Sequence, residues 1–145
     1  MVELQRFVDA QDPVYAQVCS ELRRGRKSSH WMWFVFPQLR GLGTSPMAER
    51  YAIDSLAEAE AYLRHPVLGP RLLECVGLVT AVDGRSIGEI FGYPDDLKFR
   101  SSATLFARAA SDPDERRTFE RALDKYFSGE GDPRTLLALG PIERV

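Results

Sequence analysis

The sequence predicts an all-α fold, a compact multihelical single domain of about six to seven helices over residues 1–145. Three observations predict this class. Apolar residues recur at helical spacing along most of the chain, helix-start signals precede many of these segments, and alternation of apolar and polar residues is nearly absent. A chain of 145 residues also fits one domain that folds without a metal or a disulfide.

Several helix starts are marked by local sequence signals. Proline is favoured at the first position of a helix, directly after a residue whose side chain caps that helix. Four pairs fit this rule: Asp12-Pro13, Ser45-Pro46, Asp112-Pro113 and Asp132-Pro133. Two Ser-x-x-Glu capping boxes, Ser55 with Glu58 and Ser86 with Glu89, predict two further starts.

The apolar stripes follow these signals in chain order. The first runs from Asp12 to a stop at Gly25. The later ones cover residues 55–65, 68–83, 86–91, 95–106, 112–127 and 132–139. The stripe after Asp112 is the clearest, and Gly129 ends it. These stripes account for the predicted helices.

The segment 29–38 holds both tryptophans and is the most concentrated aromatic stretch in the chain. A basic run at 23–27 precedes it, and a glycine-rich exit at 40–45 follows it. Its apolar period is ambiguous and Pro37 closes it. Either a buried helix turn or an irregular core strand fits this pattern.

Composition and motifs exclude several classes of function. A net charge of −2 argues against strong non-specific binding of nucleic acid, and no apolar run approaches the roughly 18 residues of a membrane span. We therefore expect neither a nucleic acid nor a membrane as partner. Cys19 and Cys75 are isolated, which is typical of buried thiols in a reducing cytoplasm, although a disulfide is possible in principle. The sequence has no zinc, calcium, Walker, Rossmann or nucleophile-elbow motif, so we expect no metal and no cofactor.

Polar residues at the two ends of the tryptophan segment form a first candidate site. Guanidinium and ammonium groups bind phosphate, and an indole is a stacking surface for a base. His30 lies between the basic run and the aromatic residues and is suited to acid–base work. Tryptophans in a short apolar run are also typical of a core, and basic residues are common at helix C-termini, so both interpretations stay open.

A second candidate cluster lies at 95–104, where polar residues interrupt an otherwise buried helical pattern. A buried polar face needs partners, which are either other side chains or a ligand. Glu49 follows the Ser45-Pro46 start and is expected to line the same cavity as this cluster, so the predicted catalytic residues are His30, Glu49 and Asp95. The two clusters together predict as ligand-binding residues Arg26, Lys27, Trp31, Trp33, Gln38, Arg40, Lys98, Ser101 and Ser102.

These motifs resemble a family of small uncharacterised bacterial proteins that often carry the label "calpastatin". The resemblance rests on the His-Trp-Met-Trp-Phe motif within residues 25–39, and on residues 41–43, 65–69, 95–98 and 101–106. It covers nearly the whole chain and implies a multihelical single domain without an established activity. The label itself implies no function here, because inhibitors of calcium-dependent proteases use extended repeats.

A fainter similarity is to the NADAR superfamily, whose members act in NAD and ADP-ribose chemistry and cleave N-glycosidic bonds. In that superfamily an aromatic segment precedes a Glu-His-Tyr motif and a catalytic lysine. This chain has Glu49-Arg50-Tyr51 at the place of the motif, and the next lysine is Lys98. The resemblance implies a related ligand, but without the lysine it does not imply the same catalysis.

Two functions are therefore expected as alternatives. The first is binding or processing of a nucleotide or ADP-ribose-like small molecule. The second is a non-catalytic interaction module whose tryptophan motif is structural core. Convergence of His30, Lys98 and Ser101 on one cavity, with arginines at its mouth, would favour the first, and scatter of these residues over the surface would count against it.

Overall fold

The computed structural model describes residues 3–141, and this part of the chain is all-helical. Its helices are α1 (Gln5–Gln11), α2 (Tyr15–Arg24), α3 (Met32–Val35), α4 (Pro46–Arg50), α5 (Leu56–Arg64), α6 (Leu68–Ala81), α7 (Ile87–Phe91), α8 (Asp95–Ala109), α9 (Pro113–Phe127) and α10 (Pro133–Leu139). The predicted number of six to seven helices is wrong, because these described residues form ten helices. Three of them, α3, α4 and α7, have only four or five residues each.

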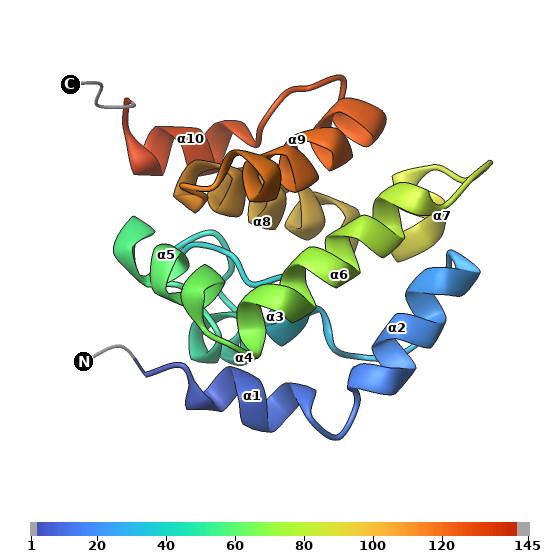
Figure 1. The fold of residues 1–145 in the computed structure, drawn as a ribbon, viewed down its shortest axis with the longest axis horizontal. Helices are drawn as coiled ribbons and strands as arrows, with labels where there is room; N and C mark the ends of the chain where they lie inside the picture. The colour runs from blue at the N-terminus through green and yellow to red at the C-terminus, as the bar shows by residue number, and fades with distance from the viewer. Residues whose placement is uncertain (1–2, 142–145) are drawn as a thin grey trace.

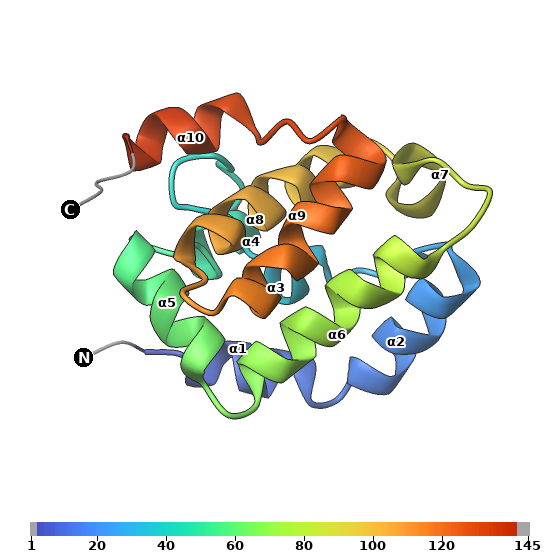
Figure 2. The same ribbon diagram turned by 45° about the horizontal axis from the view of Figure 1, so that its top comes forward.

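The helices pack around one hydrophobic core. In Figures 1 and 2, α8, α9 and α10 lie together at the C-terminal side of the molecule, and α6 runs between α9 and α2. Helix α5 packs against α6 and α8, while α1 packs against the short α3. Among the described residues no helix is long and apolar enough to cross a membrane. A single domain over 1–145 and a cytoplasmic location stay predictions.

Three of the four predicted Asp/Ser-Pro starts are confirmed. The side chains of Ser45, Asp112 and Asp132 each accept a backbone N–H from the first turn of the helix that follows. The fourth prediction is wrong, because Asp12 is the C-cap residue of α1 and α2 begins only at Tyr15. The Asp12 carboxylate instead pairs with Arg71 of α6 at 2.9 Å.

The two predicted capping boxes differ in the structure. Ser86 and Glu89 form a complete box, in which each side chain accepts the other residue's backbone N–H. These bonds hold the pKa of the Glu89 carboxyl below its ordinary value. Ser55 accepts the N–H of Glu58, but the Glu58 carboxylate accepts the N–H of Asp54 and pairs with Arg6. Only half of that box therefore forms.

The tryptophan segment forms a buried helix turn, which is one of the two conformations expected for it. Trp31 is 1 % exposed, and Phe36 packs edge-to-face on Phe91 and Phe99 with ring centroids 5.8 and 5.1 Å apart. Directly after this segment, Leu39 forms an isolated parallel bridge with Ile53. The chain from α3 thereby comes to lie beside the segment that joins α4 to α5.

Cys19 and Cys75 are buried free thiols, as the sequence indicates. They lie where α2 meets α6, near Tyr15 and Glu74. Burial raises the pKa of the Cys75 thiol above its ordinary range. Because a thiol that resists ionisation is a poor nucleophile, Cys75 serves in packing between the two helices.

Candidate functional site

The basic run and the start of α8 meet through three charged side chains. The Lys27 ammonium lies 3.0 Å from one oxygen of the Asp95 carboxylate, and the Lys98 ammonium lies 3.4 Å from the other. The Lys27, Asp95 and Lys98 side chains are 10 %, 20 % and 25 % exposed. Two cations therefore share one carboxylate in a partly desolvated place, which leaves one positive charge without a counterion inside this triad.

The two tryptophans lie beside this triad but in different environments. The Lys27 ammonium lies 5.3 Å from the ring centroid of Trp31, and the Lys98 ammonium lies 5.5 Å from that of Trp33. Trp31 is buried, and its indole N–H donates to the Glu21 carboxylate at 3.0 Å. Trp33 remains partly exposed. Trp31 is therefore core, whereas Trp33 offers an aromatic surface to solvent.

Trp33 also lines a small depression at the surface. Four predicted site residues line it: Trp33, Gln38, Arg40 and Glu49. Its volume is about 320 Å³ when its open mouth is counted, and its interior has room for about one water molecule. Trp33 is thus the residue that joins the depression to the lysine triad.

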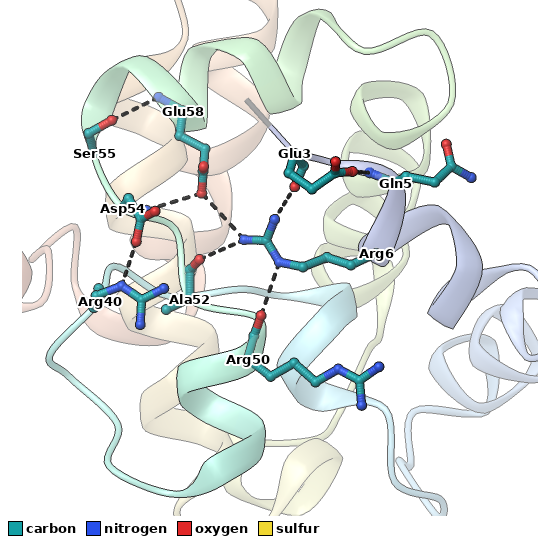
Figure 3. Close-up of polar contacts among 9 residues, drawn as sticks. All are labelled: Glu3, Gln5, Arg6, Arg40, Arg50, Ala52, Asp54, Ser55 and Glu58. Atoms are coloured by element: carbon teal, nitrogen blue, oxygen red, sulfur yellow. Dashed lines mark hydrogen bonds and ion pairs between the residues drawn. The ribbon is translucent and has the colours of Figure 1, made fainter. Parts of the chain in front are cut away.

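Arg6 of α1 supports the wall of this depression, and Figure 3 shows its contacts. Its guanidinium donates to the carbonyl oxygens of Arg50 and Ala52, each at 3.0 Å, and to that of Glu3. It also lies 3.6 Å from the Glu58 carboxylate. We call this set of contacts the Arg6 clamp. It holds the segment after α4, whose residues form one side of the depression.

The same network reaches Arg40 at the rim. The Glu58 carboxylate accepts the backbone N–H of Asp54, and the Asp54 carboxylate accepts a hydrogen bond from the Arg40 guanidinium. Arg40 is half exposed in this pair. Its side chain is therefore held at the edge of the depression while part of it remains open to solvent.

Replacement of Arg6 by alanine is expected to lower the free energy of unfolding by about 1–3 kcal/mol, because the partly buried carbonyl oxygen of Ala52 and the Glu58 carboxylate lose their partner. Lysine at this position keeps the charge but not the forked donors, so we expect an intermediate loss. Arg117→Ala is the control, since Arg117 is exposed on α9. Urea denaturation measures all three variants, and equal midpoints for R6A and R117A would contradict the clamp.

Glu21 is the residue that sequence analysis missed. It is fully buried on α2 and accepts the backbone N–H groups of Ser28 and Ser29 at 2.7 and 3.0 Å, the Ser29 hydroxyl at 2.5 Å and the Trp31 indole N–H at 3.0 Å. It thereby fixes the path of the chain from Lys27 to Trp31. The available signal was its place three residues after Val18, on the apolar face of α2.

Burial alone would raise the pKa of the Glu21 carboxyl. The hydrogen bonds from Ser29, Ser28, Gln17 and Trp31 outweigh burial and lower that pKa to about 2. The carboxylate is therefore charged at neutral pH in the folded protein. Its role is to hold the Ser28–Trp31 segment rather than to exchange protons.

Within the described part of the chain, four other predicted site residues form no ion pair with the triad. Ser101 is buried and shares a 2.9 Å hydrogen bond with Thr135 of α10, so a side chain is its partner. Ser102 is 1 % exposed, and its hydroxyl has no hydrogen-bond partner among the described residues. Arg26 and His30 are exposed on the segment between α2 and α3.

The depression beside Trp33 does not show the expected convergence. His30, Lys98 and Ser101 do not line the depression, although Arg40 lies at its rim. A wider groove between α8, α9 and α10 contains none of the predicted site residues. Its walls carry Arg108 and Arg116 together with Glu120 and Asp124, so their charges balance. No cluster of three or more potential metal ligands occurs in the described part of the chain.

The fold and the site define a small all-helical protein with a basic and aromatic corner around Trp33. The sequence model of the family described as "Protein of unknown function (DUF1810)" matches residues 1–139, and the chain belongs to this family. This confirms the expected membership in an uncharacterised family. Neither the label "calpastatin" nor the NADAR superfamily is part of this finding.

The fold is also similar to a crystal structure. The conserved hypothetical protein Rv1873 from Mycobacterium tuberculosis shares 62 % sequence identity with this chain, with a TM-score of 0.91. The alignment covers 95 % of this chain and 96 % of the mycobacterial protein. A comparison with curated proteins found no match.

Proposed function

We propose that this protein binds a nucleotide or ADP-ribose-like small molecule at the corner around Trp33. The observation that carries the proposal is the double environment of Trp33. This partly exposed indole contacts the Lys98 ammonium and also lines the depression formed with Gln38, Arg40 and Glu49. An aromatic surface beside a cation and several hydrogen-bonding groups is what a base linked to phosphate requires.

The size of the depression supports a specific division of roles. Because its interior holds about one water molecule, it fits a single polar group, such as a ribose hydroxyl, and not a whole nucleotide. The base then lies against Trp33 at the surface. The Gln38 amide and the Glu49 carboxylate are the hydrogen-bonding groups, and Arg40 provides a cation at the rim.

Among the predicted catalytic residues, Glu49 has the place that best suits chemistry on such a ligand, since it is exposed and lines the depression. Asp95 is already paired with two ammonium groups, so its carboxylate serves to balance charge. His30 and Arg26 are exposed outside the depression and are available to a ligand that extends toward α2.

The buried half of the motif favours the second function, a non-catalytic interaction module. Trp31 is 1 % exposed and its N–H group is bonded to Glu21, so this indole has no face to offer a ligand. If Trp33 serves only to cover the core next to Lys98, the whole motif is structural. The two functions therefore differ in what Trp33 does.

Tryptophan fluorescence separates these functions because only one indole is accessible. We expect ADP-ribose, NAD or a simple nucleotide to quench the emission of Trp33, and the Trp33→Phe variant to lose that response while Trp31 still emits. At 100 times its dissociation constant the ligand raises the free energy of unfolding by about 2.7 kcal/mol. The absence of both a quench and a thermal shift across the panel would reject the proposal in favour of the interaction module.

A further inference from the structure

We infer that the Lys27–Asp95–Lys98 triad is a phosphate-binding subsite in which Asp95 holds the place of the phosphate while no ligand is bound. This inference rests on the proposed function, because it assigns the anionic part of the same ligand. Its starting point is the charge count of the triad, in which two ammonium groups at 3.0 and 3.4 Å share one carboxylate.

The burial of the triad makes this charge count significant. On an exposed surface, the charge of an extra lysine is screened by water and salt. Here the Lys27 side chain is only 10 % exposed, and the two lysines also lie against the rings of Trp31 and Trp33. Cations held in a partly desolvated place attract an anion more strongly than cations in open solvent. A phosphate dianion that displaces the Asp95 carboxylate balances both ammonium groups, which one carboxylate does not.

The frame around the triad is rigid, which favours binding of a defined group. The Lys27 backbone N–H donates to the Ile90 carbonyl oxygen at 2.8 Å, and Glu21 holds the residues that follow. On the other side, Asp95 and Lys98 lie in the first turn of α8. An acidic residue is common in the first turn of a helix because the helix dipole favours it, so the presence of Asp95 alone does not indicate an anion-binding site. The shared pairing with two lysines from different elements is the feature that indicates an anion site.

The position of the triad relative to Trp33 sets the class of ligand. Lys98 contacts both the Asp95 carboxylate and the ring of Trp33. A ligand that stacks on Trp33 therefore brings an attached phosphate or pyrophosphate next to Lys98. The wider groove of α8, α9 and α10 has balanced charges on its walls and offers no such preference. We thus assign the phosphate of a nucleotide or ADP-ribose-like ligand to this triad.

Titration calorimetry at constant ionic strength tests the subsite with sodium pyrophosphate and inorganic phosphate as probes. We expect pyrophosphate to bind the wild-type protein, with an affinity about tenfold lower in Lys98→Gln and about tenfold higher in Asp95→Asn, where the internal anion is removed. Asp96→Asn is the matched control, because Asp96 lies in the same turn of α8 and accepts only the backbone N–H of Leu97. Arg117→Gln controls for loss of one positive charge.

The outcomes separate this inference from the proposed function. Pyrophosphate affinities that are equal in wild type, K98Q and D95N, or the absence of pyrophosphate binding, would overturn the subsite. Adenosine, which has no phosphate, tests the Trp33 surface alone through its fluorescence. If pyrophosphate behaves as expected while adenosine and ADP leave Trp33 unchanged, the subsite stands and the nucleotide proposal fails. Circular dichroism verifies that each variant is folded, and K98Q decides by itself if D95N does not fold.

Discussion

Replacement of Glu21 by glutamine is expected to lower the free energy of unfolding by about 2–4 kcal/mol at neutral pH. The carboxylate accepts hydrogen bonds from five donors, those of Gln17, Ser28, Trp31 and both groups of Ser29. An amide keeps the shape but has one acceptor oxygen, and its NH₂ group then faces another donor. The loss is large because the Glu21 side chain is fully buried, its bond from Trp31 is buried, and the other four bonds are partly buried.

The same residue predicts a dependence of stability on acid. The folded-state pKa of about 2 lies below the ordinary value of 4.5, so the unfolded protein binds the proton first. Glu21 therefore stabilises the fold fully above pH 4.5, and this contribution, about 3 kcal/mol, is lost as the pH falls toward about 2. The difference in stability between wild type and E21Q must shrink over the same interval.

Urea denaturation at a series of pH values from 7 down to the acid range measures this difference. Glu120→Gln is the control, because Glu120 is exposed on α9 and its replacement leaves stability nearly unchanged. Trp31 emission reports separately whether its environment changes when the bond to Glu21 is lost. A wild-type protein that loses stability in parallel with E21Q on acidification would show that Glu21 is not the stabilising carboxylate.

Replacement of Gly69 by alanine is expected to destabilise the fold by about 3 kcal/mol, at the upper end of overpacking effects. A methyl group at Gly69 would lie 2.1 Å from the backbone oxygen of Leu63 and 2.9 Å from its carbon. The contact is with backbone, so no side chain is able to rotate away. Helices α5 and α6 approach each other closely at this turn, and the added methyl forces them apart.

Gly77 on the same helix provides the matched comparison. A methyl group there meets nothing within 4 Å, and the position is exposed. Gly77→Ala is expected to raise the free energy of unfolding by about 0.5–1 kcal/mol, since alanine favours the helix. Chemical denaturation should show a lower free energy of unfolding for Gly69→Ala and a higher one for Gly77→Ala. A change of the same sign and size in both variants would disprove the close approach of α5 and α6.

The helices that depend on local signals were predictable from the sequence. Ser45, Asp112 and Asp132 cap helices as expected, because a cap acts within one turn of its own helix. Helix α1 was not predicted, since its first residue follows Leu4, which makes no side-chain cap. Its Phe7 is fully buried and its Arg6 forms the clamp, so distant packing stabilises this short helix.

The candidate site likewise combines features that local sequence predicts with features that depend on distant contacts. The residue types of the site, tryptophans flanked by lysine, arginine and glutamine, were identified from their concentration in segment 29–38 and its flanks. Both Trp31 and Trp33 were predicted to bind a ligand, although only Trp33 reaches solvent. That difference depends on Glu21, which binds the indole of Trp31 from another helix.

The sequence by itself determined the all-helical class, most helix starts and the stretch that carries the candidate site, because helical periodicity and capping act between residues a few positions apart. Only the tertiary structure decided which of two neighbouring tryptophans is core, that Lys27 and Lys98 share the Asp95 carboxylate, and that Arg6 holds the depression beside Trp33. Those contacts join residues far apart in the chain. Their geometry follows from how the helices pack, which no local pattern encodes.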